Sequence, residues 1–212
     1  MSAGVTPFDL YALGLAGAPL TVRYRDGRRT RARLDRWLGG TDASDASVLD
    51  HAVGPVLDVG CGPGRHLVAC RRRGLPALGV DLSAAAVDAA RRRGADAVRG
   101  SVFGPVPHAG AWGTALLLDG NIGIGGTPHA LLTRVRELLR PGGRVLVELD
   151  PPGGPSGPAM VRLESDETHS GWFDWAHVAA DEAHAVAGLA GLRVTASWDS
   201  GGRWFACLAA AR

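Results

Sequence analysis

A glycine-rich segment directly after a short apolar run constrains the fold of this chain more than any other sequence feature. Residues 56–59 form the mostly apolar run, and Gly60, Gly62 and Gly64 follow at alternate positions. Three glycines let the backbone turn sharply and approach a ligand closely, because no side chain stands in the way. The dinucleotide fingerprint G-x-G-x-x-G is not matched, since Arg65 stands where its third glycine would fall. The pattern favours a ligand-binding turn between a strand and a helix over a merely tight turn.

Strands and helices alternate from this segment onward. We expect strands over 56–59, 77–80, 95–99, 114–118 and 144–149, and helices over 65–73, from Ser83 to Gly94 and from Thr127 to about residue 140. This alternation implies a parallel sheet with helices on both faces. After a helix over 180–190, strands over 192–198 and 204–209 are joined by a tight turn, which can join only antiparallel strands. We therefore predict an α/β fold: a doubly wound, Rossmann-like, mostly parallel seven-stranded sheet with an antiparallel C-terminal strand pair.

Two segments lie outside this alternation. Residues 1–54 are expected to form an N-terminal cap, with a helix over 8–15, a hairpin that turns at Asp26-Gly27 and a short helix over 47–52. Residues 55–212 are expected to form the main domain, with an inserted segment at about 151–178. That connection is long for a doubly wound fold, which marks it as a candidate for substrate recognition.

Charge and composition disfavour several classes of function. All 23 basic side chains are Arg, so chemistry that needs a lysine Schiff base is excluded. A net charge of +2 disfavours nucleic acid as a partner. No apolar run approaches the roughly 20 residues of a membrane helix, and no signal peptide is recognisable. The three cysteines are too few for a disulfide framework and lack metal-ligand spacing. We expect a cytoplasmic monomer or homodimer that binds neither a membrane nor a metal.

Polar side chains follow two of the predicted parallel strands. Ligands of doubly wound sheets bind at the carboxyl ends of the strands, where Asp81 could accept hydrogen bonds from both hydroxyls of a ribose. Asp81 could also simply start a helix, but the glycine-rich turn favours the ribose. After the fourth strand come Asp119, Gly120 and Asn121, the last being the only asparagine in the chain. Asn121 could contact a ligand, or it could adopt the left-handed conformation of a turn.

Three stretches closely resemble signatures of the class I S-adenosylmethionine-dependent methyltransferases. They are Val56-Leu-Asp-Val-Gly-Cys-Gly-Pro-Gly-Arg-His66, Gly79-Val-Asp-Leu-Ser83 and Leu138-Leu-Arg-Pro-Gly-Gly-Arg-Val-Leu-Val-Glu148, so that the resemblance spans about residues 55–150. It implies S-adenosylmethionine as cofactor and S-adenosylhomocysteine as product. The glycine loop would cradle the methionine part, Asp81 would hold the ribose, and the segment at Ser101 would flank the adenine. The cofactor-binding residues implied by this resemblance are Asp58, Gly60, Cys61, Gly62, Gly64, His66, Asp81, Leu82, Ser101, Val102, Asp119, Gly120 and Asn121.

The chain departs from the family pattern at the adenine end. The family often carries an acidic residue after the third strand, which hydrogen-bonds the adenine amino group. Here the segment is Gly100-Ser101-Val102. The Ser101 hydroxyl can still accept a hydrogen bond, but a neutral acceptor binds more weakly than a charged one. The departure predicts modest cofactor affinity.

The resemblance implies methyl transfer to a small organic molecule, in which catalysis is chiefly in-line positioning of the acceptor. A base is needed if the acceptor atom carries a proton, and the candidates are His169, Asp174 and His177. Taken alone, each of them fits a surface residue better than a base. The candidate acceptor-contacting residues are Tyr11, Tyr24, Trp172 and Trp175. The tryptophans could close over an apolar substrate, or they could pack an inserted hairpin.

Two other functions remain open at this stage. The chain could be a regulatory module that binds the cofactor without turnover, or a non-methylating enzyme of the same fold, such as a cyclase. Asp150-Pro-Pro-Gly superficially resembles a motif of methyltransferases acting on amino groups of nucleic acid bases, but it follows the fifth strand and lacks the aromatic residue. Methyl transfer to a small-molecule acceptor in secondary metabolism is the favoured hypothesis.

Overall fold

The computed structural model describes residues 4–211, and its main element is a seven-stranded sheet. In the order β10-β11-β7-β6-β3-β4-β5, its strands are Leu192–Ser200, Arg203–Ala210, Leu139–Leu149, Trp112–Leu117, Val56–Val59, Ala77–Asp81 and Ala97–Arg99. The five strands from β7 to β5 are parallel, and β11 pairs antiparallel with both β7 and β10. The structure thus confirms the predicted mostly parallel, doubly wound sheet with an antiparallel C-terminal pair.

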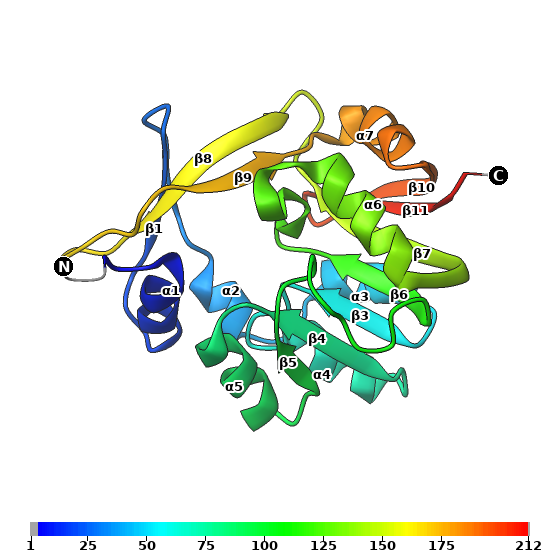
Figure 1. Cartoon of the computed structure of the whole chain (residues 1–212), viewed down its shortest axis with the longest axis horizontal. Coiled ribbons are helices and arrows are strands. Elements are labelled where there is room, and N and C mark those ends of the chain that lie inside the picture. The colour runs from blue at the N-terminus through cyan, green and yellow to red at the C-terminus, as the bar shows by residue number, and fades with distance from the viewer. Residues whose placement is uncertain (1–3, 212) are drawn as a thin grey trace.

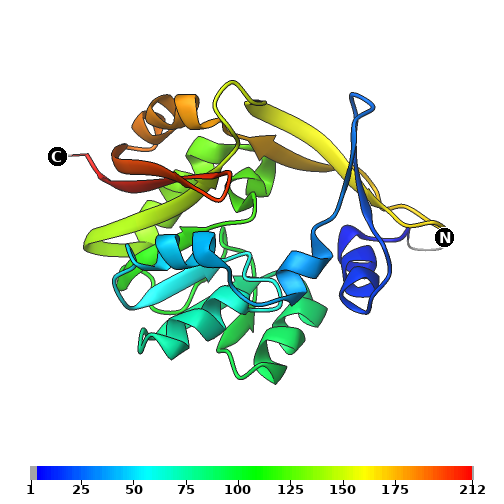
Figure 2. The ribbon, with the colours of Figure 1, turned by 180° about the vertical axis from the view of Figure 1, so that it is seen from behind.

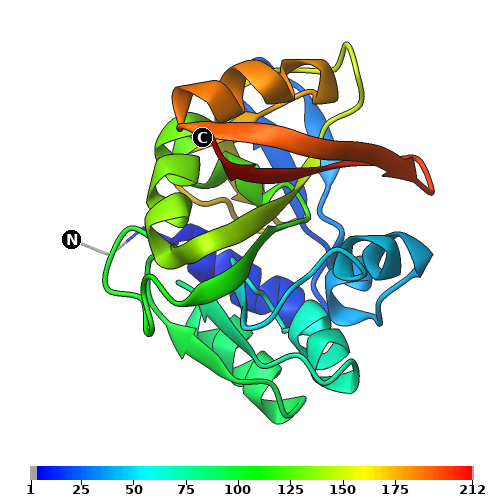
Figure 3. The same cartoon turned by 90° about the vertical axis from the view of Figure 1, so that its right-hand side faces the viewer.

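Helices cover both faces of this sheet. Successive strand residues point to opposite faces, so β3 and β6 send alternate side chains into two separate cores. One core packs against α6 (Pro128–Leu138) and α7 (Ala183–Leu189), and the other against α3 (Ala43–Leu49) and α4 (Arg65–Arg72). The helix α5 (Ala84–Arg92) packs beside α4. Figure 3 shows the two helical layers on either side of the strands.

Local capping chemistry explains where several helices begin. The Ser83 hydroxyl accepts a hydrogen bond from the backbone of Ala86, as its position predicted. Thr127 precedes Pro128, but its side chain makes no capping hydrogen bond, so that part of the prediction was wrong. The predicted helix over 47–52 was also placed too late. Asp42 and Asp45 form a capping box that starts α3 at residue 43.

A second sheet joins two segments that are far apart in the sequence. The predicted N-terminal hairpin forms as β1 (Thr21–Tyr24) and β2 (Arg29–Arg31). It pairs with a hairpin from the inserted segment, β8 (Gly157–Glu164) and β9 (Phe173–His177), in the order β2-β1-β8-β9. Figures 1 and 2 show this cap sheet extending over the main sheet, with α1 (Pro7–Leu15) and α2 (Leu34–Leu38) beneath the N-terminal hairpin. The division at residue 54 stays a prediction, since the cap strands pair with the insertion.

The element that follows β6 is a distorted 3-10 segment, η1 (Asn121–Gly126), and a short 3-10 turn, η2 (Ala180–Glu182), precedes α7. The β9 strand packs closely on η1, since a Cβ atom added to Gly123 would lie 2.6 Å from Trp175 Nε1. Among the described residues, no helix is long and apolar enough to cross a bilayer.

Candidate functional site

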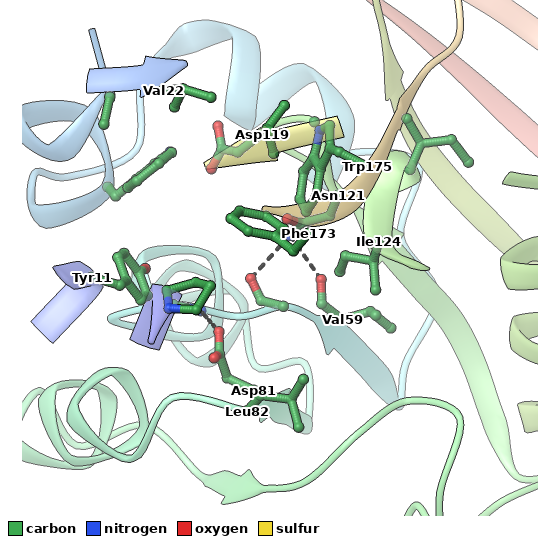
Figure 4. Close-up of a pocket in the computed structure, with 18 of the residues that line it drawn as sticks. Tyr11, Val22, Val59, Asp81, Leu82, Asp119, Asn121, Ile124, Phe173 and Trp175 are labelled. Carbon is green, nitrogen blue, oxygen red and sulfur yellow. Dashed lines mark hydrogen bonds between the residues drawn. The ribbon is translucent and has the colours of Figure 1, made fainter. Parts of the chain in front are cut away.

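A cavity of about 940 Å³ lies where the carboxyl ends of the parallel strands meet the cap sheet. Its floor comes from the loops after β3, β4 and β6, and its roof comes from β1, β8 and β9. This is the edge at which doubly wound sheets bind ligands. Figure 4 shows Tyr11, Asp81 and Leu82 on one side of the cavity, and Asn121, Ile124, Phe173 and Trp175 across from them.

Asn121, which follows β6, holds the glycine-rich loop that follows the adjacent strand β3 by two hydrogen bonds. Its amide nitrogen donates to the carbonyl oxygens of Val59 and Gly60, at 2.8 and 2.9 Å. Gly60 has a φ of +69°, and a Cβ atom there would lie 2.8 Å from that same nitrogen. Glycine is therefore required at this position both for the turn and for the approach of Asn121.

Asp81 presents a half-buried carboxylate to the cavity. It accepts hydrogen bonds from the backbone of Gly62 at 2.9 Å and of Ser83 at 2.8 Å. Burial nevertheless raises the pKa of Asp81, because the two backbone donors do not replace the lost hydration. Each carboxylate oxygen keeps a further lone pair. Asp81 thus has acceptor capacity for two hydroxyl donors of a ligand in the cavity.

Tyr11 lies against the glycine-rich loop rather than with the other predicted acceptor residues. A Cβ atom added to Gly62 would lie 3.0 Å from its hydroxyl oxygen. Burial, with a smaller contribution from the charge of Asp81, raises the pKa of Tyr11. Its ring packs edge-on against Trp37 of α2 at 5.9 Å. The tyrosine therefore stays a neutral hydrogen-bonding group at the cofactor end of the cavity.

A buried ion-pair network lies beneath the cavity and was not predicted. Arg65 bonds both Asp45 of α3 and Asp119 after β6. Arg203 bonds Asp45 at 2.7 Å and holds both oxygens of Glu148, at 2.8 and 2.6 Å. Arg65 and Glu148 lie in the signature-like stretches, and Asp119 is one of the implied cofactor-binding residues, so the sequence could have pointed to these three. Asp45 and Arg203 carry no local sequence signal.

The face of the cap sheet that lines the cavity is largely apolar and aromatic. Cross-strand partners share one face of a sheet, so the register places on it Val22, Tyr24, Val161, Leu163, Phe173, Trp175 and His177. Phe173 and Trp175 meet edge to face, with ring centres 6.4 Å apart. Trp172 is exposed, with the Arg162 guanidinium 4.9 Å from its ring centre. The tryptophans therefore belong to an inserted hairpin and also line the cavity.

Most of the predicted site residues meet in this one cavity. Those that line it are Gly60, Cys61, Gly62, His66, Asp81, Leu82, Ser101, Val102, Asp119, Gly120, Asn121, Tyr11, Tyr24, Trp172, Trp175, Asp174 and His177. Asp58, Gly64 and His169 do not. Asp58 is buried within β3, 3.7 Å from the His66 ring, and Gly64 packs α4 against Ala90. His169 is exposed in the β8–β9 turn and contacts the Ser170 carbonyl.

Comparison with known proteins finds similarity to methyltransferases. Residues 56–143 match the model of a methyltransferase domain. The chain thus resembles methyltransferases over the part that holds the glycine-rich loop and Asp81. It is 28% identical over 143 residues to trans-aconitate 2-methyltransferase from Paracidovorax citrulli, and the match covers 66% of this chain and 54% of that protein. The chain thus spans about half the length of this curated relative.

Solved structures of methyltransferases share the fold. An S-adenosylmethionine-dependent methyltransferase from Bacteroides fragilis, solved with S-adenosyl-L-homocysteine, superimposes with a TM-score of 0.81. It is 22% identical, and the match covers 99% of this chain and 98% of that one. An O-methyltransferase from neocarzinostatin biosynthesis, solved with S-adenosyl-L-homocysteine and 1,4-dihydroxy-2-naphthoic acid, has a TM-score of 0.56 and 26% identity. That match covers 73% of this chain and 48% of the other.

Proposed function

We propose that this chain is an S-adenosylmethionine-dependent methyltransferase that acts on a small organic molecule, in secondary metabolism. The half-buried carboxylate of Asp81 carries the proposal, because its unused acceptor capacity faces a cavity and lies next to a glycine-rich turn. A ribose diol supplies the two hydroxyl donors that such a carboxylate lacks. The residues present therefore fit an adenosyl ligand.

The neighbouring residues extend this site at both ends of the ribose. Leu82 and Val102 offer apolar contacts to an adenine ring, and Ser101 offers a hydroxyl. At the other end, the loop from Gly60 to Gly62 and the hydroxyl of Tyr11 would hold the methionine part. When bound, S-adenosylmethionine supplies an electrophilic methyl carbon on a sulfonium sulfur. The role of the protein is then to exclude water and to aim the acceptor atom at that carbon.

The cap sheet supports a small molecule as the acceptor. Its aromatic and aliphatic side chains close the cavity opposite the cofactor residues, as expected of a pocket that binds a small apolar ligand. The relatives named above act on or bind small molecules, namely trans-aconitate and a dihydroxynaphthoic acid. Secondary metabolism is the setting of the neocarzinostatin enzyme, and we propose it for this chain too.

Ligand-dependent thermal unfolding tests the proposal. S-adenosylhomocysteine should raise the melting temperature of the wild type, because a ligand that binds only the folded state stabilises it by mass action. Asp81→Ala should lose most of this shift. Asp88→Ala, which removes an exposed carboxylate from the adjacent helix α5, should keep it. Stabilisation by nicotinamide dinucleotides, with none by S-adenosylhomocysteine, would overturn the proposed function.

A further inference from the structure

His177 and Asp150 form a hydrogen-bonded pair on the cavity wall, outside the cofactor residues. The His177 Nδ1 atom lies 2.8 Å from Asp150 Oδ2, which joins the end of β9 to the end of β7. Both residues line the cavity. An ionised carboxylate can only accept, so Nδ1 carries the proton, and the lone pair of the neutral ring is on Nε2.

The Nε2 atom of His177 is buried and has no hydrogen-bond partner within the described residues. A buried polar atom without a partner is costly, and such groups are usually satisfied by protein, water or ligand. The ring is also held in orientation, since Tyr24 packs against it with ring centres 5.6 Å apart at 31°. The His177–Asp150 pair, called the dyad below, is therefore a proton acceptor of fixed orientation. No group within the described residues donates a hydrogen bond to its Nε2 atom.

The residues around the dyad indicate what kind of molecule would supply the missing hydrogen-bond donor. Val161, Leu163 and Phe173 lie on the same face of the cap sheet as His177, and Tyr24 lies beside it. The titratable and charged groups near the dyad include Tyr24, Asp26 and Arg28, and the Arg28 guanidinium pairs with Asp26 and lies 4.3 Å from the centre of the Tyr24 ring. An apolar surface of rings with one fixed acceptor suits a flat, mostly apolar molecule that carries a hydroxyl group.

We propose that His177, oriented by Asp150, is the general base for a hydroxylated aromatic acceptor bound on the inner face of the cap sheet. This inference rests on the proposed function. The acceptor hydroxyl donates to Nε2 and passes its proton there, giving an imidazolium paired with Asp150. The acceptor oxygen receives the methyl group in place of that proton. The sulfonium loses its positive charge when it gives up the methyl group. The proton that His177 then releases to water carries this charge out of the site.

Binding of two probes tests the dyad independently of turnover. The probes are 2-naphthol and 2-fluoronaphthalene, which share the ring system, but only the first can donate a hydrogen bond. Calorimetry in the presence of S-adenosylhomocysteine should show about fivefold tighter binding of 2-naphthol to the wild type, the usual effect of one net hydrogen bond. The preference should vanish in His177→Phe, which keeps a ring to pack on Tyr24. Asp150→Asn should reduce it, and this variant serves if His177→Phe does not fold.

Turnover of 2-naphthol supplies the second measurement. The kcat for its methylation should fall at least about 100-fold in His177→Phe, the usual contribution of a general base. His184→Phe, which replaces an exposed histidine of α7, should match the wild type. A wild type without preference for 2-naphthol, or equal kcat values in the wild type and His177→Phe, would overturn the role of the dyad. Failure of the wild type to bind S-adenosylhomocysteine would instead overturn the proposed function.

Discussion

The Arg65 Nη2 atom donates to both carboxylate oxygens of Asp119, each at 2.8 Å. Arg65 begins α4 directly after the glycine-rich loop, and Asp119 lies just beyond the end of β6. The pair therefore ties together two ligand-facing loops from adjacent strands. Because Arg65 also bonds Asp45, this tie extends to α3 at the back of the loop.

Removing Arg65 should destabilise the whole domain. Arg65→Met keeps the length of the side chain, but it leaves Asp45 without one cation and Asp119 without the nitrogen that donates to both of its oxygens. Breaking a buried ion pair by removing one partner typically costs about 3–5 kcal/mol. Urea unfolding measures the change, and Arg72→Met on the exposed side of α4 should stay within about 0.5 kcal/mol of the wild type. Equal losses in the two variants would contradict a structural role for the network.

The stability of the protein should depend on the protonation of His66. Burial by itself lowers the pKa of His66, but the carboxylates of Asp45 and Asp58 more than offset this and raise it to about 9. The unfolded value is about 6.5. The imidazolium therefore stabilises the folded state fully below about pH 6.5, and this contribution is lost as the pH rises through about 9.

Urea unfolding of the wild type and of His66→Gln at pH 6.5, 8 and 9.5 checks this dependence. The free energy of unfolding of the wild type should fall with pH more steeply than that of the variant. Parallel pH profiles would mean that His66 does not carry the charge between the two carboxylates.

Ser101→Asp should tighten cofactor binding. The Ser101 hydroxyl accepts the backbone N–H of Phe103 at 3.2 Å, and an aspartate can keep this bond with one oxygen while offering the other to an adenine amino group. A charged acceptor in place of a neutral one is worth about 1 kcal/mol, or roughly fivefold in affinity. Calorimetry with S-adenosylhomocysteine measures the gain. Weaker binding by the variant would place the adenine amino group elsewhere.

The two cavity-lining tryptophans of the insertion should behave differently. Trp172 is 37% exposed, so Trp172→Ala should change the free energy of unfolding by about 1 kcal/mol or less and act mainly on 2-naphthol binding. Trp175 packs on Phe173 and η1, so Trp175→Ala should cost roughly 3 kcal/mol. Urea unfolding and calorimetry on both variants distinguish these outcomes. Comparable destabilisation by the two substitutions would show that Trp172 is a packing residue as well.

The sequence by itself determined the parts of this protein that rest on local patterns. The turn after β3 needs glycine at residue 60, Ser83 starts α5 by capping it, and the apolar face of α6 repeats with the helical period. Asp81 was also predictable, because the carboxyl ends of neighbouring parallel strands meet at one edge of the sheet. Each of these inferences needs only residues that are close in the chain or strands that are adjacent in order.

Only the tertiary structure decided which distant segments meet. The β1 strand pairs with β8, and nothing in either segment specifies the other, since backbone hydrogen bonds are the same for every residue type. The pairs between Arg203 and Asp45, and between His177 and Asp150, join residues with no shared period or motif. The mutual position of such groups is decided by the packing of the whole chain, because a charge is stabilised by whichever partner the fold brings within hydrogen-bond distance.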